Sequence, residues 1–142
     1  MAVPLGDPVH ADVWFDGACL GNPGPMGAGA VVVVAGRRQV VSRRVGRGTN
    51  NEAEYHGVIA GLRHALAAGA THVTVRGDSQ LVLRHLDGSY AVRAANLRPL
   101  YEEARGLLDR FEDVQLQWVR REANADADRA ARAAVQSEDS TG

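Results

Sequence analysis

Four acidic side chains of this chain stand inside or next to apolar segments rather than on solvated faces. They are Asp16, Glu54, Asp78 and Asp128. Asp16 interrupts a run of strand-forming residues, and the interiors of strands disfavour Asp. A carboxylate that faces the protein interior is costly unless a cation compensates its charge, and no interior partner is obvious for these four. Acidic residues on four separate elements therefore predict a shared metal ion.

The ligands of such an ion would all be oxygen atoms, which favours hard divalent cations such as Mg²⁺ or Mn²⁺ over zinc. Two such ions about 3.5–4 Å apart suit an in-line displacement at phosphorus, because one activates the attacking water and the other stabilises the leaving oxygen. The pattern therefore indicates hydrolysis of a phosphate ester. A plainer interpretation stays open for Asp78, because an Asp between a strand and a helix is often only the helix N-cap.

Two glutamates two positions apart, Glu52 and Glu54, open the longest predicted helix, 51–68. An α-helix turns by about 100° per residue, so their side chains point about 200° apart. Val58 and Leu62 follow Glu54 by four and eight positions, which places Glu54 on the face that should be buried. Glu52 instead completes the pattern Thr49-x-x-Glu52, a capping box at the start of the helix. We therefore assign Glu52 a structural role and Glu54 a functional one.

The segments that must position these residues alternate between strand and helix patterns. Strands are predicted at 11–19, 28–35, 39–46, 71–78 and 114–119, and helices at 51–68, 79–86, 94–110 and 124–135. The Gly- and Pro-rich segment 20–27 is predicted to be a loop. The order β-β-β-α-β-α-α-β-α predicts an α/β fold, in which a five-stranded mixed sheet combines a three-strand antiparallel meander with two parallel strands and is flanked by helices.

Length and composition fit one soluble globular domain, since the chain has 142 residues, 45% hydrophobic and 23% charged. We expect this domain at 11–135, with flexible tails at 1–10 and 136–142. Without an apolar run of about 18 residues or a secretory signal, no membrane association is expected. The single cysteine, Cys19, is consistent with a reducing, cytoplasmic setting.

The charge balance gives no bulk electrostatic reason to expect nucleic-acid binding, because the net charge is −1. All 16 basic residues are arginine. Guanidinium groups are planar forks suited to phosphate, but an arginine-only composition also follows from a biased genome. Composition leaves both explanations open.

Each of the four acidic residues belongs to a short motif. The motifs are Phe15-Asp16-Gly17-Ala18-Cys19-Leu20-Gly21-Asn22-Pro23-Gly24-Pro25, Thr49-Asn50-Asn51-x-x-Glu54, Gly77-Asp78-Ser79-Gln80 and Asn124-x-x-x-Asp128-x-x-Ala131. One such motif alone is weak, but four in this order, spread over 11–135 and each supplying a carboxylate, resemble the type 1 ribonuclease H family. The predicted order of strands and helices also matches the ribonuclease H-like fold of that family.

The resemblance implies an endonuclease that hydrolyses the RNA strand of an RNA–DNA hybrid with two Mg²⁺ ions, leaves 5′-phosphate ends and has little sequence specificity. By the same resemblance, Asp16 would bridge both ions. Glu54 and Asp78 would complete one metal site, and Asp128 would complete the other. The hybrid duplex is then the expected partner, and no obligate protein partner is inferred.

The resemblance also assigns residues to substrate binding. Asn22, Thr49 and Asn51 would contact the nucleic-acid backbone, and Asn50, Ser79 and Gln80 would meet the minor groove and its 2′-hydroxyl groups. Local alternatives stay open: the asparagines could simply begin a helix, Ser79 could cap one, and Asn22 could belong to a plain turn.

The chain departs from the family pattern in two places. Many relatives carry a histidine in the loop before the last helix, whereas the corresponding loop here, 120–123, has none. Arg121, or less plausibly Arg120, could partly replace that histidine by contacting phosphate, and a solvated arginine pair is the plain alternative. Some relatives also have a basic helical protrusion, whereas 81–96 has no basic cluster, so weaker hybrid binding is expected.

Two rival functions remain possible on sequence grounds. A binding module with the same fold would grip hybrids without cutting them, although such a module would have no need to keep all four carboxylates. A DNA nuclease of the resolvase or transposase kind shares the architecture. The Thr49-Asn50-Asn51 and Asp78-Ser79-Gln80 motifs favour hybrids instead.

Overall fold

The computed structural model describes residues 6–136 as five strands, four α-helices and one short 3₁₀-helix. The strands are β1 (His10–Cys19), β2 (Gly24–Val34), β3 (Arg37–Gly48), β4 (His72–Gly77) and β5 (Asp113–Trp118). The helices are α1 (Asn50–Ala67), α2 (Gln80–Leu86), α3 (Arg98–Leu108), the 3₁₀-helix η1 (Arg121–Asn124) and α4 (Ala125–Gln136).

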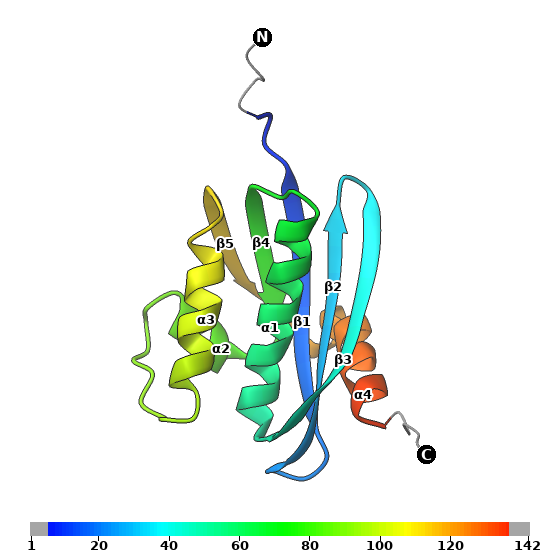
Figure 1. The fold of residues 1–142 in the computed structure, drawn as a ribbon, viewed down its shortest axis with the longest axis vertical. Helices are drawn as coiled ribbons and strands as arrows, with labels where there is room; N and C mark the ends of the chain where they lie inside the picture. Colours follow the sequence, from blue (N-terminus) through cyan, green and yellow to red (C-terminus); the bar gives the residue numbers. More distant parts are fainter. Residues whose placement is uncertain (1–5, 137–142) are drawn as a thin grey trace.

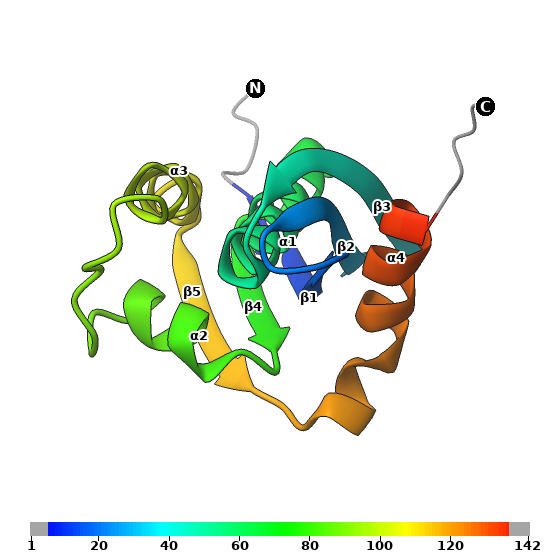
Figure 2. The same cartoon turned by 90° about the horizontal axis from the view of Figure 1, so that it is seen from below.

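The strands form one mixed sheet in the order β3-β2-β1-β4-β5. The β1–β2 and β2–β3 pairs are antiparallel, and the β1–β4 and β4–β5 pairs are parallel. Helices α1 and α3 lie on one face of the sheet, and α4 covers the other face next to β1, β2 and β3 (Figures 1 and 2). The predicted fold class and element order are therefore confirmed.

The main core lies between the sheet and α1, and strand alternation explains how it forms. Val13 and Phe15 point to the same face of β1 and are fully buried against α1 residues that include Val58 and Leu62. This core also contains a buried polar pair, the Tyr55 hydroxyl and His85 Nδ1, which are 2.7 Å apart. The α1 stripe that was predicted to be buried is the one that faces the sheet.

The prediction of a loop over the whole of 20–27 is wrong, because β2 already begins at Gly24 and pairs there with Gly48. The glycines had indicated a turn, but at Gly27 the lack of a side chain permits close packing. A Cβ atom at Gly27 would lie 2.3 Å from the Ala131 carbonyl oxygen of α4. Glycine therefore lets the α4 backbone rest directly on the strand.

Other boundaries differ from the predicted ones at element ends, where sequence patterns are least sharp. Helix α3 begins at Arg98 rather than at residue 94, and the predicted loop 120–123 largely forms η1. Strand β1 begins at His10 and α4 ends at Gln136, each one residue inside a predicted tail. Within those predicted tails, residues 1–5 and 137–142 lie outside the described residues. None of the helices in the described part of the chain could span a lipid bilayer.

Candidate active site

Asp16 lies near the end of the central strand β1 and is only 5% exposed. Helix α1 approaches this part of β1 closely, because a Cβ atom at Gly57 would lie 2.3 Å from the Asp16 carbonyl oxygen. One carboxylate oxygen of Asp16 accepts a hydrogen bond from the Gly17 N–H group at 2.9 Å. The close helix–strand contact therefore brings the first turns of α1 directly beside the Asp16 carboxylate.

Glu54 lies in the first turns of α1, whose start is fixed by a complete capping box. The Thr49 hydroxyl accepts from the Glu52 N–H group at 3.2 Å, and Glu52 Oε1 accepts from the Thr49 N–H group at 2.8 Å. The structural role predicted for Glu52 is confirmed. Glu54 points the other way, and its Oε1 atom is buried without a hydrogen-bond partner among the described residues.

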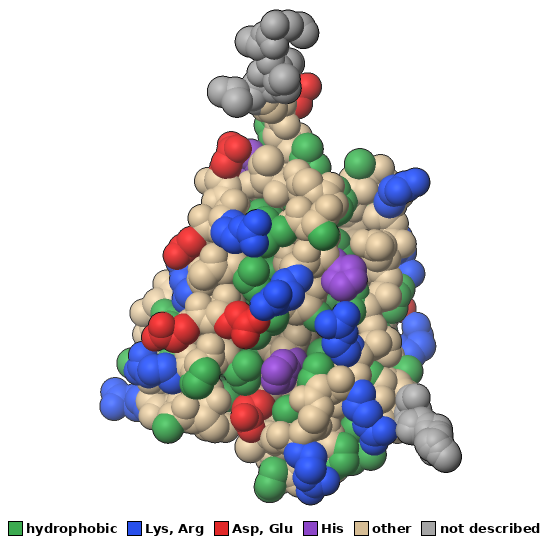
Figure 3. Space-filling view, in the orientation of Figure 1, with side chains coloured by type: hydrophobic (Ala, Val, Ile, Leu, Met, Phe, Trp, Pro, Cys, Tyr) green, Lys and Arg blue, Asp and Glu red, His purple; other side chains and the backbone are tan. Residues whose placement is uncertain are grey.

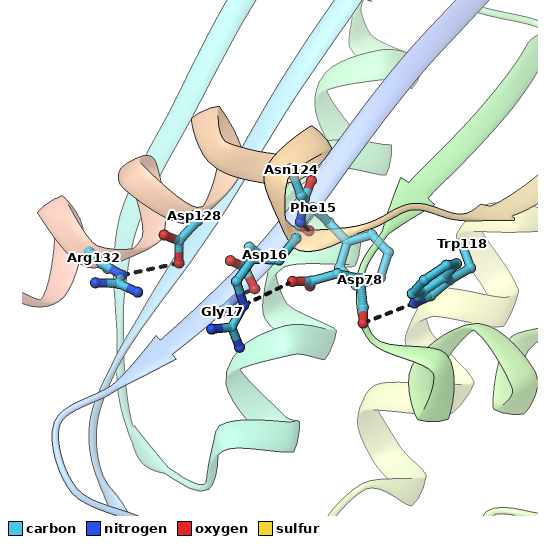
Figure 4. Close-up of polar contacts among 9 residues, drawn as sticks. Phe15, Asp16, Gly17, Asp78, Trp118, Asn124, Asp128 and Arg132 are labelled. Atoms are coloured by element: carbon cyan, nitrogen blue, oxygen red, sulfur yellow. Dashed lines mark hydrogen bonds and ion pairs between the residues drawn. The ribbon is translucent and has the colours of Figure 1, made fainter.

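Asp78 directly follows β4, and the helix after it is capped by the next residue. Ser79 Oγ accepts from the Val82 N–H group at 3.2 Å, so Ser79 is the N-cap of α2 and Asp78 is not. The plain interpretation of Asp78 as an N-cap is therefore wrong, whereas that of Ser79 is confirmed. The Trp118 indole N–H donates to the Asp78 backbone carbonyl at 3.3 Å, which leaves the Asp78 carboxylate turned toward Asp16 (Figure 4).

Three of the four predicted carboxylates converge on one point. Asp16, Glu54 and Asp78 each offer an oxygen atom, and these atoms lie within 4.8 Å of one another. Burial, followed by the neighbouring charge of Asp78, raises the pKa of Asp16 to about 7. Burial and the Asp16 charge raise the pKa of Glu54 well above its ordinary value. Three acids held together without an adjacent buried cation are the donor set of a hard divalent metal.

Asp128 lies on α4 and faces the same cleft from the other side (Figure 4). Its Oδ1 atom accepts from Arg132 Nε at 3.1 Å, one helical turn away. The start of α4 is fixed to β1 by Asn124, whose Nδ2 atom donates to the Phe15 carbonyl oxygen at 2.8 Å. Asp128 is therefore placed opposite the convergent triad, and its carboxylate is hydrogen-bonded to an arginine of its own helix.

The four carboxylates line one open cleft of about 540 Å³. Of the predicted substrate-binding residues, Asn50, Ser79 and Arg121 also line it. Arg121 is strongly exposed, with its Nε atom 3.9 Å from Asp78 Oδ2. Asn22 Oδ1 accepts from the Asn50 N–H group at 3.0 Å. Arg132, Cys19 and Leu20 also line this cleft and were not among the predicted site residues. Cys19 and Leu20 belong to the Asp16 motif, and Arg132 could have been found from its spacing of four residues from Asp128.

The remaining predicted substrate residues stand beside this cleft rather than among its lining residues. Thr49 is the N-cap of α1, with Asn51 in the first turn, and Gln80 is the first residue of α2. The plain alternatives for Asn50 and Asn51 are thus realised in part, because both lie in the first helical turn. A capping role leaves the exposed atoms of these side chains available to a ligand.

Comparison with known proteins places this geometry in a family. A family model described as reverse transcriptase-like matches residues 14–134. The solved N-terminal RNase H domain of Rv2228c from Mycobacterium tuberculosis is 40% identical, with a TM-score of 0.86 over 90% of this chain and 94% of that one. The chain is a member of the type 1 ribonuclease H family.

Other ribonuclease H proteins extend the comparison. Ribonuclease HI of Halobacterium salinarum is 41% identical over 133 residues, 92% of this chain and 65% of that protein. The solved LC11-RNase H1, in complex with an RNA/DNA hybrid, is 30% identical, with a TM-score of 0.81 over 89% of this chain and 96% of that one. The bifunctional protein Rv2228c is 43% identical over 123 residues, and the chain spans 34% of its length.

Proposed function

We propose that this ribonuclease H family member is an endonuclease that hydrolyses the RNA strand of RNA–DNA hybrids, leaves 5′-phosphate ends and has little sequence specificity. The observation that carries the proposal is the convergence of Asp16, Glu54 and Asp78 within 4.8 Å at the bottom of an open cleft. The solved relative in complex with an RNA/DNA hybrid supports the substrate class.

The acidic residues fit a divalent metal, because Glu54 Oε1 is buried without a partner in the described chain, and burial together with repulsion from Asp16 raises the pKa of the Glu54 carboxyl group. Asp16, Glu54 and Asp78 would hold one Mg²⁺ ion, and Asp16 with Asp128 would hold a second, with Mn²⁺ as a possible substitute. Bound there, the ions would polarise the scissile phosphate and lower the pKa of the attacking water. The chain itself supplies a rigid acidic pocket on β1, α1, β4 and α4.

Substrate binding would fall to polar groups around the cleft. We assign the nucleic-acid backbone to Asn22, Thr49 and Asn51, and the minor groove with its 2′-hydroxyl groups to Asn50, Ser79 and Gln80. Arg121 is exposed beside Asp78 and would contact phosphate in place of the histidine that the loop lacks. Recognition of shape and 2′-hydroxyl groups rather than base edges gives little sequence preference.

The distribution of charge offsets the near-zero total. Strand β3 contains five arginines and no acidic residue, and it ends at the start of α1 beside the cleft. On the face drawn in Figure 3, the charged side chains on the β3 side are almost all basic, whereas acidic and basic side chains are mixed on the α3 side. A segregated basic strand can attract a polyanion that the net charge of −1 would not. We infer a cytoplasmic setting and no obligate protein partner.

Incubation of a labelled RNA–DNA hybrid with the protein and Mg²⁺ tests the proposal. We expect cleavage of the RNA strand, and an Asp16→Asn variant should be inactive because it lacks the ligand shared by both metal sites. DNA–DNA and RNA–RNA duplexes of the same sequence are the comparison substrates. A hybrid that is bound but stays uncut at high enzyme would favour a binding module, and equal cleavage of DNA–DNA would favour a DNA nuclease.

A further inference from the structure

Large apolar side chains are exposed at only a few positions in the described part of the chain. They are Leu20, Val40, Tyr90 and Trp118. Leu20 lines the acidic cleft, and Trp118 is hydrogen-bonded to Asp78. Exposed apolar side chains beside a polar cleft indicate a ligand-binding surface, because apolar surface is unfavourable in water and becomes favourable when a ligand covers it.

Trp118 is held in one place by the end of the sheet. It is the last residue of β5, opposite Gly77 in register, and the following Val119 N–H group donates to the Gly77 carbonyl oxygen at 2.9 Å. The indole N–H donates to the Asp78 carbonyl at 3.3 Å, yet 47% of the residue remains exposed. A ring that is already oriented loses little conformational entropy when a ligand covers it.

The position of the ring points to its ligand. Figure 4 shows the indole beside Asp78, on the side away from Asp128 and Arg132. The other tryptophan, Trp14, differs because its ring is stacked with the Arg76 guanidinium, 5.0 Å from the ring centre. Trp118 has no comparable stacking partner among the described residues, so an aromatic face next to a proposed metal ligand is available.

We propose that Trp118 is a substrate-binding residue that packs against a ribose of the RNA strand next to the phosphate faced by Asp78. This inference rests on the proposed function, in which the strand held at Asp78 is RNA. An A-form-like duplex presents its riboses and 2′-hydroxyl groups along a wide, shallow minor groove. The indole of Trp118, at the end of the edge strand β5, can reach into such a groove. A sugar contact of this kind tolerates any base sequence, as stacking contacts do.

Tryptophan fluorescence tests the contact directly. In an Asp16→Asn, Trp14→Phe protein, Trp118 is the single tryptophan, and binding of an unlabelled hybrid should change its emission with the same midpoint as the anisotropy of a labelled hybrid. Anisotropy that rises while the emission stays constant would overturn the Trp118 contact and leave the proposed function intact. Failure of the hybrid to bind at all would overturn both.

Kinetics separate a ribose contact from an indirect effect on Asp78. We expect Trp118→Leu to raise KM about fivefold to tenfold, with kcat changed less than about twofold, for purine-rich and pyrimidine-rich hybrids alike. Val40→Ala, which removes an equally exposed apolar side chain from β3, is the matched control and should leave KM unchanged. A fall in kcat at constant KM would instead make Trp118 a positioning residue for Asp78 and overturn the proposal.

Discussion

Two glutamates in the first turns of α1 have the same side chain and opposite surroundings. Glu52 accepts a backbone hydrogen bond at 2.8 Å and closes the capping box, whereas Glu54 keeps a buried oxygen without a partner in the described chain. The helix rotates by about 200° between them, so one faces the end of the helix and the other faces Asp16. Helical phase alone therefore separates a stabilising carboxylate from one that is costly to bury.

The first turns of α1 carry both an unfavourable buried carboxylate and a stabilising cap. Burial and the Asp16 charge raise the pKa of Glu54, so the site destabilises the metal-free protein. The capping box on the same turns stabilises the helix that carries Glu54, by about 1 kcal/mol for a typical cap. Polar groups that remain unsatisfied in native proteins commonly serve function, and the metal ion of the proposed function would compensate the Glu54 carboxylate.

The largest effect should follow from Glu54→Gln. We expect the rate of hybrid cleavage to fall at least about a hundredfold, because a metal ligand is replaced by a neutral amide of the same shape. The melting temperature of the metal-free protein at pH 7.5 should be retained or rise, since the variant removes the ionisable Glu54 carboxyl group from beside Asp16. Cleavage assays and calorimetry measure the two quantities. Normal activity in this variant would remove Glu54 from the site.

The free energy of unfolding should depend on pH through the protons that Asp16 and Glu54 bind. The pKa values of Asp16 and Glu54 are raised on folding, so the folded state keeps protons that the unfolded state releases. The stabilising contribution of each group is complete below its unfolded pKa of about 4 and is lost as pH rises, at about 1.4 kcal/mol per pH unit for each proton. For Asp16 the loss continues up to its folded pKa of about 7, and for Glu54 it continues up to the raised pKa of that group.

Denaturant unfolding in EDTA from pH 4 to pH 7.5 measures this slope. The free energy of unfolding of the wild type minus that of Glu54→Gln should fall over this range. Taking this difference cancels most of the contributions of the other carboxylates. Addition of Mg²⁺ at pH 7.5 should stabilise the wild type and not the variant. A difference that is flat with pH would mean that Glu54 ionises freely in the folded protein.

The smallest effect should follow from Glu52→Gln. Gln can also close a capping box, so we expect normal cleavage and a loss of at most about 1 kcal/mol in the free energy of unfolding. Glu52→Ala, which cannot close the box, is the control for the cap itself. If Glu52→Gln abolished cleavage while Glu54→Gln left it intact, the helical phase and the assignment of the site would both be wrong.

Regular patterns made most of the fold predictable. The alternation of Val13 and Phe15 and the α1 stripe through Val58 and Leu62 determine which faces are buried, and the structure confirms them. The separation of Glu52 from Glu54 follows from the same periodicity. The convergence of Asp16 with Asp78 was expected from the cost of burying unpaired carboxylates and from the motifs, but its geometry depends on the parallel β1–β4 pairing, which joins distant segments.

Features that depend on contacts between distant segments could not be predicted. Gly27 resembles a turn residue until α4 is seen against it. Whether Asp78 or Ser79 caps α2 depends on where the first helical turn begins, and both residues suit the role chemically. The exposure of Trp118 depends on the course of the chain after β5, where the sequence predicts only an apolar strand position.

The close packing of α4 against Gly27 also limits which amino-acid substitutions this protein can tolerate. Every substitution of glycine adds at least a Cβ atom, which would lie 2.3 Å from the Ala131 carbonyl oxygen, three residues beyond Asp128. Apolar core positions can be replaced by residues of similar volume, but no residue other than glycine lacks a Cβ atom, so position 27 has no conservative replacement. Natural variation and directed evolution should therefore change the apolar core of this protein gradually, whereas a substitution at Gly27 should require α4, which carries Asp128, to move as a whole.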